Sequence, residues 1–469
     1  MNSHVQVKKP KTMAAILMLG AFIGLFGETA LNMALTNIME DYAISAGTAQ
    51  WLTTGYLLVL AILVPLSAYL VRWFSTRQLV VAALVISSLG AALAAVAPSF
   101  AVLLTGRLVQ AIGTGIFLPL MFSVIMLIFP IQKRGAVMGI VGLVITAGPA
   151  LGPTLSGLII SASSWHYIFW VMVILNVLLL ISALNIENVS DISKPKIDVV
   201  SLLLSTVAFG GLIYALSTLA ETPFANPAVW APLLAGVAAL GLFIFRQLKM
   251  PEPMVDLRVF KYPMFALGTV LMVITLFVIL SVAILIPIYL KSVLAYTSIA
   301  AGLLMLPANL LNIIMAPIVG SNFDRVGARI FTRLGFSFIT VGAIVFLLIL
   351  SATTPVWQVI GALCILFLGI SMTIMPAQTH AMNQLPRELY ADGSAAMNTL
   401  TQVAGAAGTA IAITLFTAGQ KNYIAEFGAV NPAEFLAFGT HHAFYAVLIA
   451  AVLGLIGSLF IRNNREVVK

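Results

Sequence analysis

Gly320-Ser-Asn-Phe-Asp-Arg-Val-Gly-Ala-Arg329 is a short polar stretch between two long apolar runs. A degenerate copy, Ala68-Tyr-Leu-Val-Arg-Trp-Phe-Ser-Thr-Arg77, aligns with it without a gap and begins 252 residues earlier. Parallel repeats of this kind are a known transporter architecture. Two halves of six helices would place the copies closer together, so we expect two extra helices between the halves. The alternative is a pair of unrelated basic loops.

The composition of the chain argues against a water-soluble protein. The 469 residues are 61% hydrophobic and only 8% charged, whereas a soluble domain carries roughly 25% charged residues. A transmembrane helix needs roughly 20 apolar residues, so the length allows a dozen or more spans. The apolar runs are continuous, unlike the alternating strands of outer-membrane barrels. We therefore expect an all-α polytopic membrane protein.

Fourteen transmembrane helices are predicted, separated by turn residues or charges. Their expected ranges are 13–38, 50–71, 78–97, 100–122, 136–160, 165–185, 198–219, 228–248, 264–290, 296–321, 328–350, 355–382, 392–417 and 441–462. Three parts follow. Residues 1–190 form an N-terminal six-helix bundle, 191–262 supply cytoplasmic linkers with two additional transmembrane helices, and 263–469 form a C-terminal six-helix bundle.

The basic residues test this count through the positive-inside rule. With the N-terminus in the cytoplasm, 20 of the 23 lysines and arginines fall in inward loops or tails. Lys291 and Lys421 fall outside, and Arg107 falls within a helix. A wrong count of spans would scramble this alternation. We expect both termini to be cytoplasmic in a multi-pass protein of the bacterial inner membrane.

Several other classes of site are not expected. The net charge of +8 is scattered over short loops, without a basic patch for nucleic acid. The single cysteine, Cys364, excludes disulfide frameworks and CxxC metal sites, and no metal site is predicted. The sequence lacks a G-x-x-x-x-G-K-[ST] nucleotide motif. Transport would therefore run on an ion gradient, with no cofactor.

Further motifs follow one another along nearly the whole chain. They are Glu28-Thr-Ala-Leu-Asn32-Met-Ala-Leu, Gln50-Trp-Leu-Thr-Thr-Gly-Tyr56, Arg107-Leu-Val-Gln110-Ala-Ile-Gly113, Gly148-Pro149-Ala-Leu-Gly152-Pro153 and Pro253-Met-Val-Asp256-Leu-Arg-Val-Phe260. Together with 320–329, they resemble the signatures of the major facilitator superfamily, and in particular its fourteen-helix drug:proton antiporters (the EmrB/QacA subfamily). The resemblance implies the major facilitator fold, two six-helix bundles plus two central helices, and proton-coupled drug export by alternating access.

The chain departs from the family pattern at four places. One is Phe169-Trp-Val-Met172, which replaces a common helix-6 pattern that ends in Asn. Glu28 stands where Asp is usual, so the acid is kept on a longer arm. Arg72 replaces the gate Asp of the first half, which puts the ion-pair role of that loop in question. Ala111 replaces a motif Gly, which bears on close helix packing.

Glu28 is the leading candidate for proton coupling. It lies about 15 residues into the first predicted helix, roughly 22 Å from its inner end, and is the acid of the fifteen that we place inside the membrane. Apolar surroundings favour the protonated carboxyl, whereas a nearby cation, whether drug or arginine, favours the charged form. These two opposing effects on the protonation of Glu28 suit the exchange of a proton for a substrate. The alternative is a structural acid permanently paired with Arg107.

Arg107 is the second candidate for coupling, at a depth comparable to that of Glu28. An arginine there needs a partner or a wet cavity. The resemblance implies a role in proton relay or in setting the acid's proton affinity. The alternative is an anchor that hydrogen-bonds backbone carbonyls.

Two stretches are expected to take part in gating. The first comprises Gly148, Pro149, Gly152 and Pro153, and the second comprises Gly320, Asp324, Arg325, Gly327 and Arg329. Small residues let helices approach closely and proline kinks them, so the first is a flexible seal near the interface of the halves or ordinary packing. For the second, the resemblance implies a charged latch. The alternative is that the arginines only hold the loop on the cytoplasmic side, as the positive-inside rule describes. This alternative leaves Asp324 unexplained.

Polar residues inside the helices are candidates for substrate binding. They are Glu28, Asn32, Tyr56, Gln110, Asn309, Asn312, Gln378, Asn398 and Gln402. Interhelical hydrogen bonding is the alternative for many of them. His380 could titrate but is expected to be a packing residue. His441 and His442 are expected to open the last helix on the outer side.

The predicted function is export of lipophilic, neutral or monovalent cationic drugs in exchange for protons. A same-fold exporter of an endogenous lipid, siderophore or metabolite is the first alternative. A channel or a membrane enzyme is the second, although the helices hold no paired acids or His/Cys cluster for catalysis. The expected partners are small lipophilic substrates, protons and membrane lipid. A monomer is expected, and the need for a periplasmic adaptor stays open.

Overall fold

The computed structural model describes residues 7–44, 46–190, 192–193, 198–219, 224–427 and 431–462, and over these it is all-helical. The α-helices are α1 (Pro10–Ala30), α2 (Leu35–Asp41), α3 (Ala46–Trp73), α4 (Thr76–Ala95), α5 (Phe100–Ile128), α6 (Ile131–Ala162), α7 (His166–Ala183), α8 (Val199–Leu219), α9 (Pro227–Lys249), α10 (Pro263–Ile288), α11 (Ser298–Val326), α12 (Ala328–Ile349), α13 (Val356–Met382), α14 (Tyr390–Phe427) and α15 (Pro432–Leu459). Within the described residues, 13 helices are long and apolar enough to cross a membrane. The 32-residue α6 is the fourteenth long helix, so the predicted all-α fold is confirmed.

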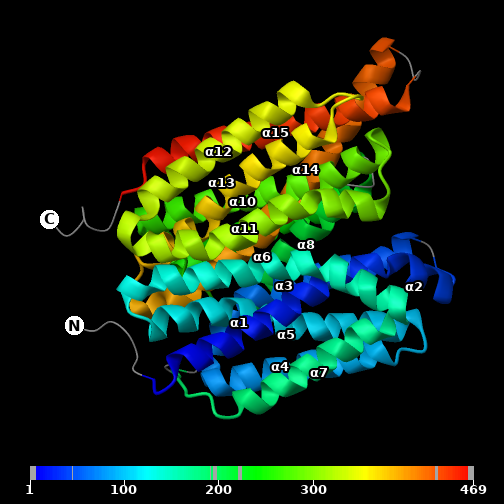
Figure 1. Ribbon diagram of the computed structural model, residues 1–469. Coiled ribbons are helices and arrows are strands. Elements are labelled where there is room, and N and C mark those ends of the chain that lie inside the picture. The colour runs from blue at the N-terminus through cyan, green and yellow to red at the C-terminus, as the bar shows by residue number, and fades with distance from the viewer. Residues whose placement is uncertain are drawn as a thin grey trace.

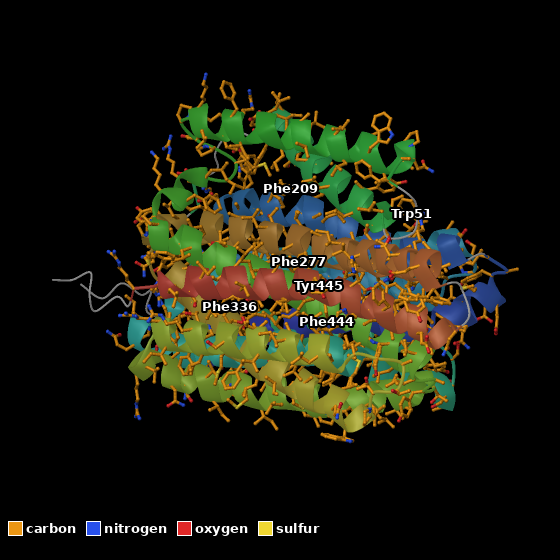
Figure 2. The ribbon with its side chains drawn as sticks, turned by 90° about the horizontal axis from the view of Figure 1, so that it is seen from above. Trp51, Phe209, Phe277, Phe336, Phe444 and Tyr445 are labelled. Atoms are coloured by element: carbon orange, nitrogen blue, oxygen red, sulfur yellow. The ribbon has the colours of Figure 1, made fainter. Side chains whose placement is uncertain are left out.

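The helices form two groups and a separate pair (Figure 1). Helices α1 to α7 pack mainly on one another and are called the first group; α10 to α15 do the same and are called the second group. The α8–α9 pair lies at the edge, where α8 contacts α3 of the first group and α14 of the second. Figure 2 shows this pair as an outer layer, with Phe209 of α8 on its inner side. Helix α1 begins and α15 ends on one side of the bundle, the cytoplasmic end in the predicted topology.

The first predicted helix, 13–38, is not continuous. Helix α1 ends at Ala30, a 3₁₀ turn spans Leu31–Met33, and α2 follows. The Leu31 N–H donates to the Thr29 carbonyl. In a continuing α-helix it would donate to the Gly27 carbonyl instead. The break therefore falls directly after Glu28, the acid that the sequence singled out.

Two other helix boundaries differ from their predicted places. Helix α15 begins at Pro432, because the Asn431 side chain caps it by accepting from the Ala433 N–H at 3.1 Å. His441 and His442 therefore lie inside α15 and do not open it. Helix α11 continues to Val326 and ends at Gly327, whose φ of 84° is a conformation that glycine adopts without strain.

Glycines and aromatic rings set the close helix contacts inside each group. A Cβ atom at Gly90 of α4 would lie 2.5 Å from the Gln110 backbone nitrogen of α5, so these two backbones touch. In the second group, Phe336 of α12 lies against Gly454 of α15, and the rings of Phe346 and Phe444 are 4.6 Å apart. Figure 2 shows Phe336 and Phe444 inside this group. The first of these contacts fixes α5, which carries most of the polar cluster below.

Candidate functional site

Arg107 lies fully buried on α5, at the contact with α1. Its Nη1 donates to the Gly27 carbonyl at 3.1 Å and to the Gln110 Oε1 at 2.7 Å. Its guanidinium also lies over the Tyr56 ring, 4.3 Å from the ring centroid. The Gly27 carbonyl is free to accept because α1 unwinds one turn later. The Nε and Nη2 atoms have no hydrogen-bond partner among the described residues.

Tyr56 joins α3 to the same cluster. Its hydroxyl donates to the Gly24 carbonyl at 3.2 Å and shares a 2.7 Å hydrogen bond with the Thr114 hydroxyl. Gln110 in turn donates to the sulfur of Met172 at 3.3 Å. Helices α1, α3, α5 and α7 therefore meet in one buried polar cluster. Of its members, Thr114 and Met172 were not among the predicted site residues, because neither side chain carries a charge that would have marked it.

Glu28 stands beside this cluster in the last turn of α1 and is half-buried. It interacts electrostatically with Arg107, yet among the described residues it forms no hydrogen bond or ion pair. The described structure therefore does not contain the predicted alternative, an ion pair between Glu28 and Arg107. Arg107 instead bonds a backbone carbonyl, as an anchor would, and keeps two donor groups unused. The arrangement leaves the Glu28 carboxyl available to a proton or a cation.

Helix α6 packs against α1 next to Glu28. A Cβ atom at Gly152 would lie 2.2 Å from the Thr29 Oγ1, and one at Gly148 would lie 2.9 Å from the Leu25 Cβ. The Thr29 hydroxyl donates to the Pro149 carbonyl at 3.4 Å. That carbonyl lacks its usual helical donor, because proline at position 153 has no N–H. These glycines thus contact α1 of their own group.

The remaining predicted polar residues divide by location. Asn312 of α11 and Gln378 of α13 are buried, and the Asn312 Oδ1 and both Gln378 side-chain polar atoms have no partner among the described residues. Asn398 of α14 is buried and donates to the Ser394 carbonyl at 2.8 Å. Asn309 and Gln402 are half-buried. The side chains of Asn32 and Pro153 lie outside the described part of the structure.

An ion pair joins the two groups at the end of the bundle that the predicted topology places in the cytoplasm. Arg72, at the end of α3, pairs with Asp392, in the first turn of α14. Asp392 is fully buried and also accepts the Asp256 N–H at 2.9 Å, while Arg72 donates to the Pro253 carbonyl at 3.2 Å. The question raised over Arg72 is therefore answered, since this loop does carry an ion pair. Asp392 is thus a second acid inside a long helix, in addition to Glu28.

Four further hydrogen bonds cross between the groups at the same end. Arg134, buried at the start of α6, donates to the Asn383 Oδ1 at 2.8 Å and to the Tyr390 hydroxyl at 3.0 Å. The Asp324 carboxylate accepts the Gly135 N–H at 3.2 Å, and Ser394 donates to the Pro119 carbonyl at 3.0 Å. We call these contacts, with the Arg72–Asp392 pair, the cytoplasmic seal.

The predicted latch residues contribute unequally to the cytoplasmic seal. Asp324 takes part, while Arg325 is exposed and Arg329 is half-buried. Asp392 and Arg134 were missed. A single acid at the start of a predicted helix was the available signal for Asp392, and Arg134 was counted only as a positive-inside residue.

Helices α6 and α11 touch backbone to backbone below these polar contacts. A Cβ atom at Gly320 would lie 2.3 Å from the Gly139 Cα and 2.7 Å from the Gly135 carbonyl oxygen. No side chain fits there, so only glycine at both positions permits this closed contact between the groups.

Replacing Gly320 with valine is expected to separate α6 from α11 and weaken the cytoplasmic seal. Overpacking costs about 1–3 kcal/mol, which is roughly tenfold or more in the population of the closed form. Gly302 is a matched control on the same helix, because a Cβ atom there meets nothing within 4 Å. We expect Gly320→Val to lose transport at normal expression and Gly302→Val to keep it. Equal transport by the two variants would contradict this account.

The comparisons with known proteins agree with this geometry. The family model of the Major Facilitator Superfamily matches residues 17–409. The chain belongs to the Major Facilitator Superfamily. It is thus a multi-pass membrane transporter, not an enzyme.

Relatives and solved structures extend the comparison. The chain is 48% identical to the lincomycin resistance protein LmrB of Listeria monocytogenes, covering 97% of this chain and 98% of the relative. It is also 48% identical to LmrB of Bacillus subtilis, covering 95% of each. The crystal structure of the human organic anion transporter MFSD10 has the same fold, with a TM-score of 0.70 at 14% identity, covering 97% of this chain and 100% of that one.

Proposed function

We propose that this chain exports lincomycin and related lipophilic drugs across the bacterial inner membrane in exchange for protons. It would then be a fourteen-helix drug:proton antiporter of the EmrB/QacA subfamily. The substrate class is suggested by the 48% identical lincomycin resistance proteins. The single observation that carries the coupling is the half-buried Glu28, which has no bonded partner among the described residues and stands beside the buried Arg107.

The polar cluster provides the means to exchange a proton for a drug. When Glu28 is ionised, its charge attracts a cationic drug or the polar groups of a neutral one. When Glu28 takes a proton, that attraction is lost and the drug leaves. Arg107 lies near enough to stabilise the ionised form of Glu28. Its Nε–H and Nη2–H groups have no partner among the described residues, so they can donate to the carboxylate or to a water.

The cytoplasmic seal provides the means for alternating access. In this proposal the two moving halves are the bundles 1–190 and 263–469, with 191–262 between them. The seal holds their cytoplasmic ends together and must break for drug to enter from inside. The Asn312 Oδ1 and the Gln378 side-chain amide have no partner among the described residues in the closed form, and they would gain water or drug as partners once that end opens.

Drug susceptibility tests this function directly. We expect expression of the chain in a susceptible bacterium to raise the inhibitory concentration of lincomycin, and a protonophore to stop lincomycin efflux from preloaded cells. Resistance without a protonophore effect would remove the proton coupling. Export of a metabolite such as a flavin, with no change in drug resistance, would favour the alternative of an endogenous substrate; a riboflavin transporter of Clostridioides difficile is 25% identical over 456 residues.

Replacing Arg107 with lysine is expected to lower transport by roughly tenfold, because a single ammonium cannot reproduce the planar fork of an arginine. Lysine keeps the charge but cannot both bond Gly27 and Gln110 and lie flat over Tyr56. Initial rates of lincomycin uptake into inside-out vesicles measure the effect. Arg77 is exposed, and Arg77→Lys is the matched control. Wild-type rates for Arg107→Lys would show that charge alone suffices.

A further inference from the structure

A cavity of about 320 Å³ lies between the α8–α9 pair and the two helix groups. Its size falls in the range of small-molecule sites. Its lining comes from α3, α8, α9, the segment before α10, and α14. The lining residues are Pro65, Phe209, Leu240, Phe243, Ile244, Leu248, Val255, Leu257, Phe260, Ala396, Thr399 and Leu400.

The cavity offers no free polar group to a ligand. Thr399 is the one lining residue with a polar side chain, and its hydroxyl already donates to the Ala395 carbonyl at 2.7 Å. A drug that carries hydroxyls or amines would lose hydrogen bonds with water there and gain none. An aliphatic chain has no such cost, so the lining selects an aliphatic chain over a polar drug.

The cavity reaches the surface beside α9. Two lining residues, Ile244 and Leu248, are 41% and 51% exposed. Their neighbours Leu242 and Phe245 are each 59% exposed. Figure 2 shows α9 as the outermost helix, beyond Phe209. Because this apolar face of a membrane helix contacts lipid, the cavity is reached from the bilayer.

Basic residues surround the mouth at the cytoplasmic end. Lys249, Arg258 and Lys261 are exposed, and they directly follow the lining residues Leu248, Leu257 and Phe260. Arg246 is already engaged: it donates to Asp198 at 2.7 and 2.9 Å and lowers the pKa of this acid to about 2. Arg258 pairs with Asp256 at 3.8 Å and Lys249 lies 4.1 Å from the centroid of the Phe245 ring. Exposed contacts of this kind contribute little free energy, so the headgroups of anionic lipids on the cytoplasmic leaflet can replace them.

The cavity is built from parts that also form the cytoplasmic seal. Ala396 lies one turn after Asp392 on α14. Between the lining residues Leu248 and Leu257, the chain supplies the Pro253 carbonyl to Arg72 and the Asp256 N–H to Asp392. Since the walls belong to both groups and to the α8–α9 pair, relative motion of the groups would change the shape of the cavity.

We propose that this cavity holds one acyl chain of an anionic phospholipid from the cytoplasmic leaflet, and that the bound chain favours the closed cytoplasmic seal. The ligand fits the apolar lining, the opening to the bilayer and the basic rim. A ligand that binds one of two states better shifts the equilibrium toward that state. The proposal does not rest on lincomycin being the transported drug.

The test uses the full chain in nanodiscs that contain phosphatidylglycerol with a diazirine in its acyl chain. After illumination, mass spectrometry maps the labelled residues. We expect labels on the lining residues of α9 and α14 to exceed those on the lipid-facing Leu348 of α12, which is 80% exposed. Equal labelling of the lining and of Leu348 would overturn the proposal without any variant.

Variants then separate the cavity from the general lipid surface. Ala396→Trp places an indole in the cavity and is expected to lower labelling of the lining by roughly fivefold, because less space remains for an acyl chain. Leu242→Trp, on the outer face of α9, is the matched control and should leave labelling unchanged. Equal labelling in the two variants, or displacement of the label by saturating lincomycin, would count against a lipid site.

A third variant tests the link to the cytoplasmic seal. Arg72→Gln removes the ion pair with Asp392 at a residue that does not itself line the cavity. We expect labelling of the lining to fall by roughly threefold or more, because the closed state becomes rarer. Unchanged labelling in this variant would show that the lipid binds both states equally and would overturn the coupling.

Discussion

Glu28→Gln is expected to abolish proton release driven by lincomycin while leaving the fold intact. An amide has the size of the carboxyl but cannot lose a proton at physiological pH, so the exchange step is removed. The fold should tolerate the change because Glu28 is half-buried and bonds no described residue. We expect proton flux to fall to the background of empty vesicles, a loss of roughly a hundredfold, since intramembrane acids commonly carry proton relays.

The measurement uses a fluorescent pH indicator in inside-out vesicles, with lincomycin added after the gradient is established. Glu28→Asp keeps the carboxyl on the shorter arm that is usual in the resembling family, and should retain part of the coupling. Glu40 is an exposed acid at the end of α2, so Glu40→Gln is a matched control and should behave as wild type. Undiminished proton release in Glu28→Gln would assign the coupling to another residue.

The long helices and the two charged residues of the candidate site could be predicted from the sequence. Long apolar runs and the inward bias of lysine and arginine determine the spans without reference to tertiary contacts. Glu28 and Arg107 stand out because charges inside such runs are rare. The sequence therefore located the candidate site on its two helices, although the bonding of Arg107 to the Gly27 carbonyl was only one of the alternatives.

The break of the first helix could not be predicted in the same way. The residues from Leu31 onward are apolar enough to continue the run, and no proline interrupts them. The break is accompanied by a tertiary contact, because the freed Gly27 carbonyl takes its donor from α5, 80 residues away. Local hydropathy carries no information about such a partner.

The cytoplasmic seal escaped prediction because its partners are distant in sequence. Arg72 and Asp392 are separated by 320 residues, and each was assigned on its own to a boundary between helices. Only the folded arrangement shows that the substitution of Arg for the usual gate Asp is matched by an acid on the opposite group. An ion pair between the two groups is thus present at this loop despite the substitution.

Breaking the Arg72–Asp392 pair is expected to open the cytoplasmic end, and exchanging the two charges is expected to close it again. Asp392 is fully buried, so removing Arg72 leaves an uncompensated charge, which costs about 3–5 kcal/mol. That energy corresponds to roughly a hundred- to a thousandfold shift between the two states. Arg72→Asp should be the most damaging single change, because it places two acids together. Transport should fall at least tenfold.

The double variant Arg72→Asp, Asp392→Arg is expected to recover transport only in part. The ion pair can form again with its charges exchanged. The Asp256 N–H, which donates to Asp392 at 2.9 Å, would face an arginine, and the Pro253 carbonyl would lose its donor Arg72. A double variant no better than either single change would show that the pair does not act as a unit.

Cysteine accessibility distinguishes an opened seal from a misfolded protein. Ser394 is buried and bonds the Pro119 carbonyl across the two groups, so Ser394→Cys in a Cys364→Ser background reports opening at the cytoplasmic end. Arg72→Asp should raise its maleimide labelling from the cytoplasmic side, and the charge exchange should lower it again. Asp198→Asn breaks an ion pair of similar geometry within the α8–α9 pair and should leave labelling unchanged. If both broken pairs raise labelling equally, the effect is general destabilisation and the Arg72–Asp392 pair is not a latch.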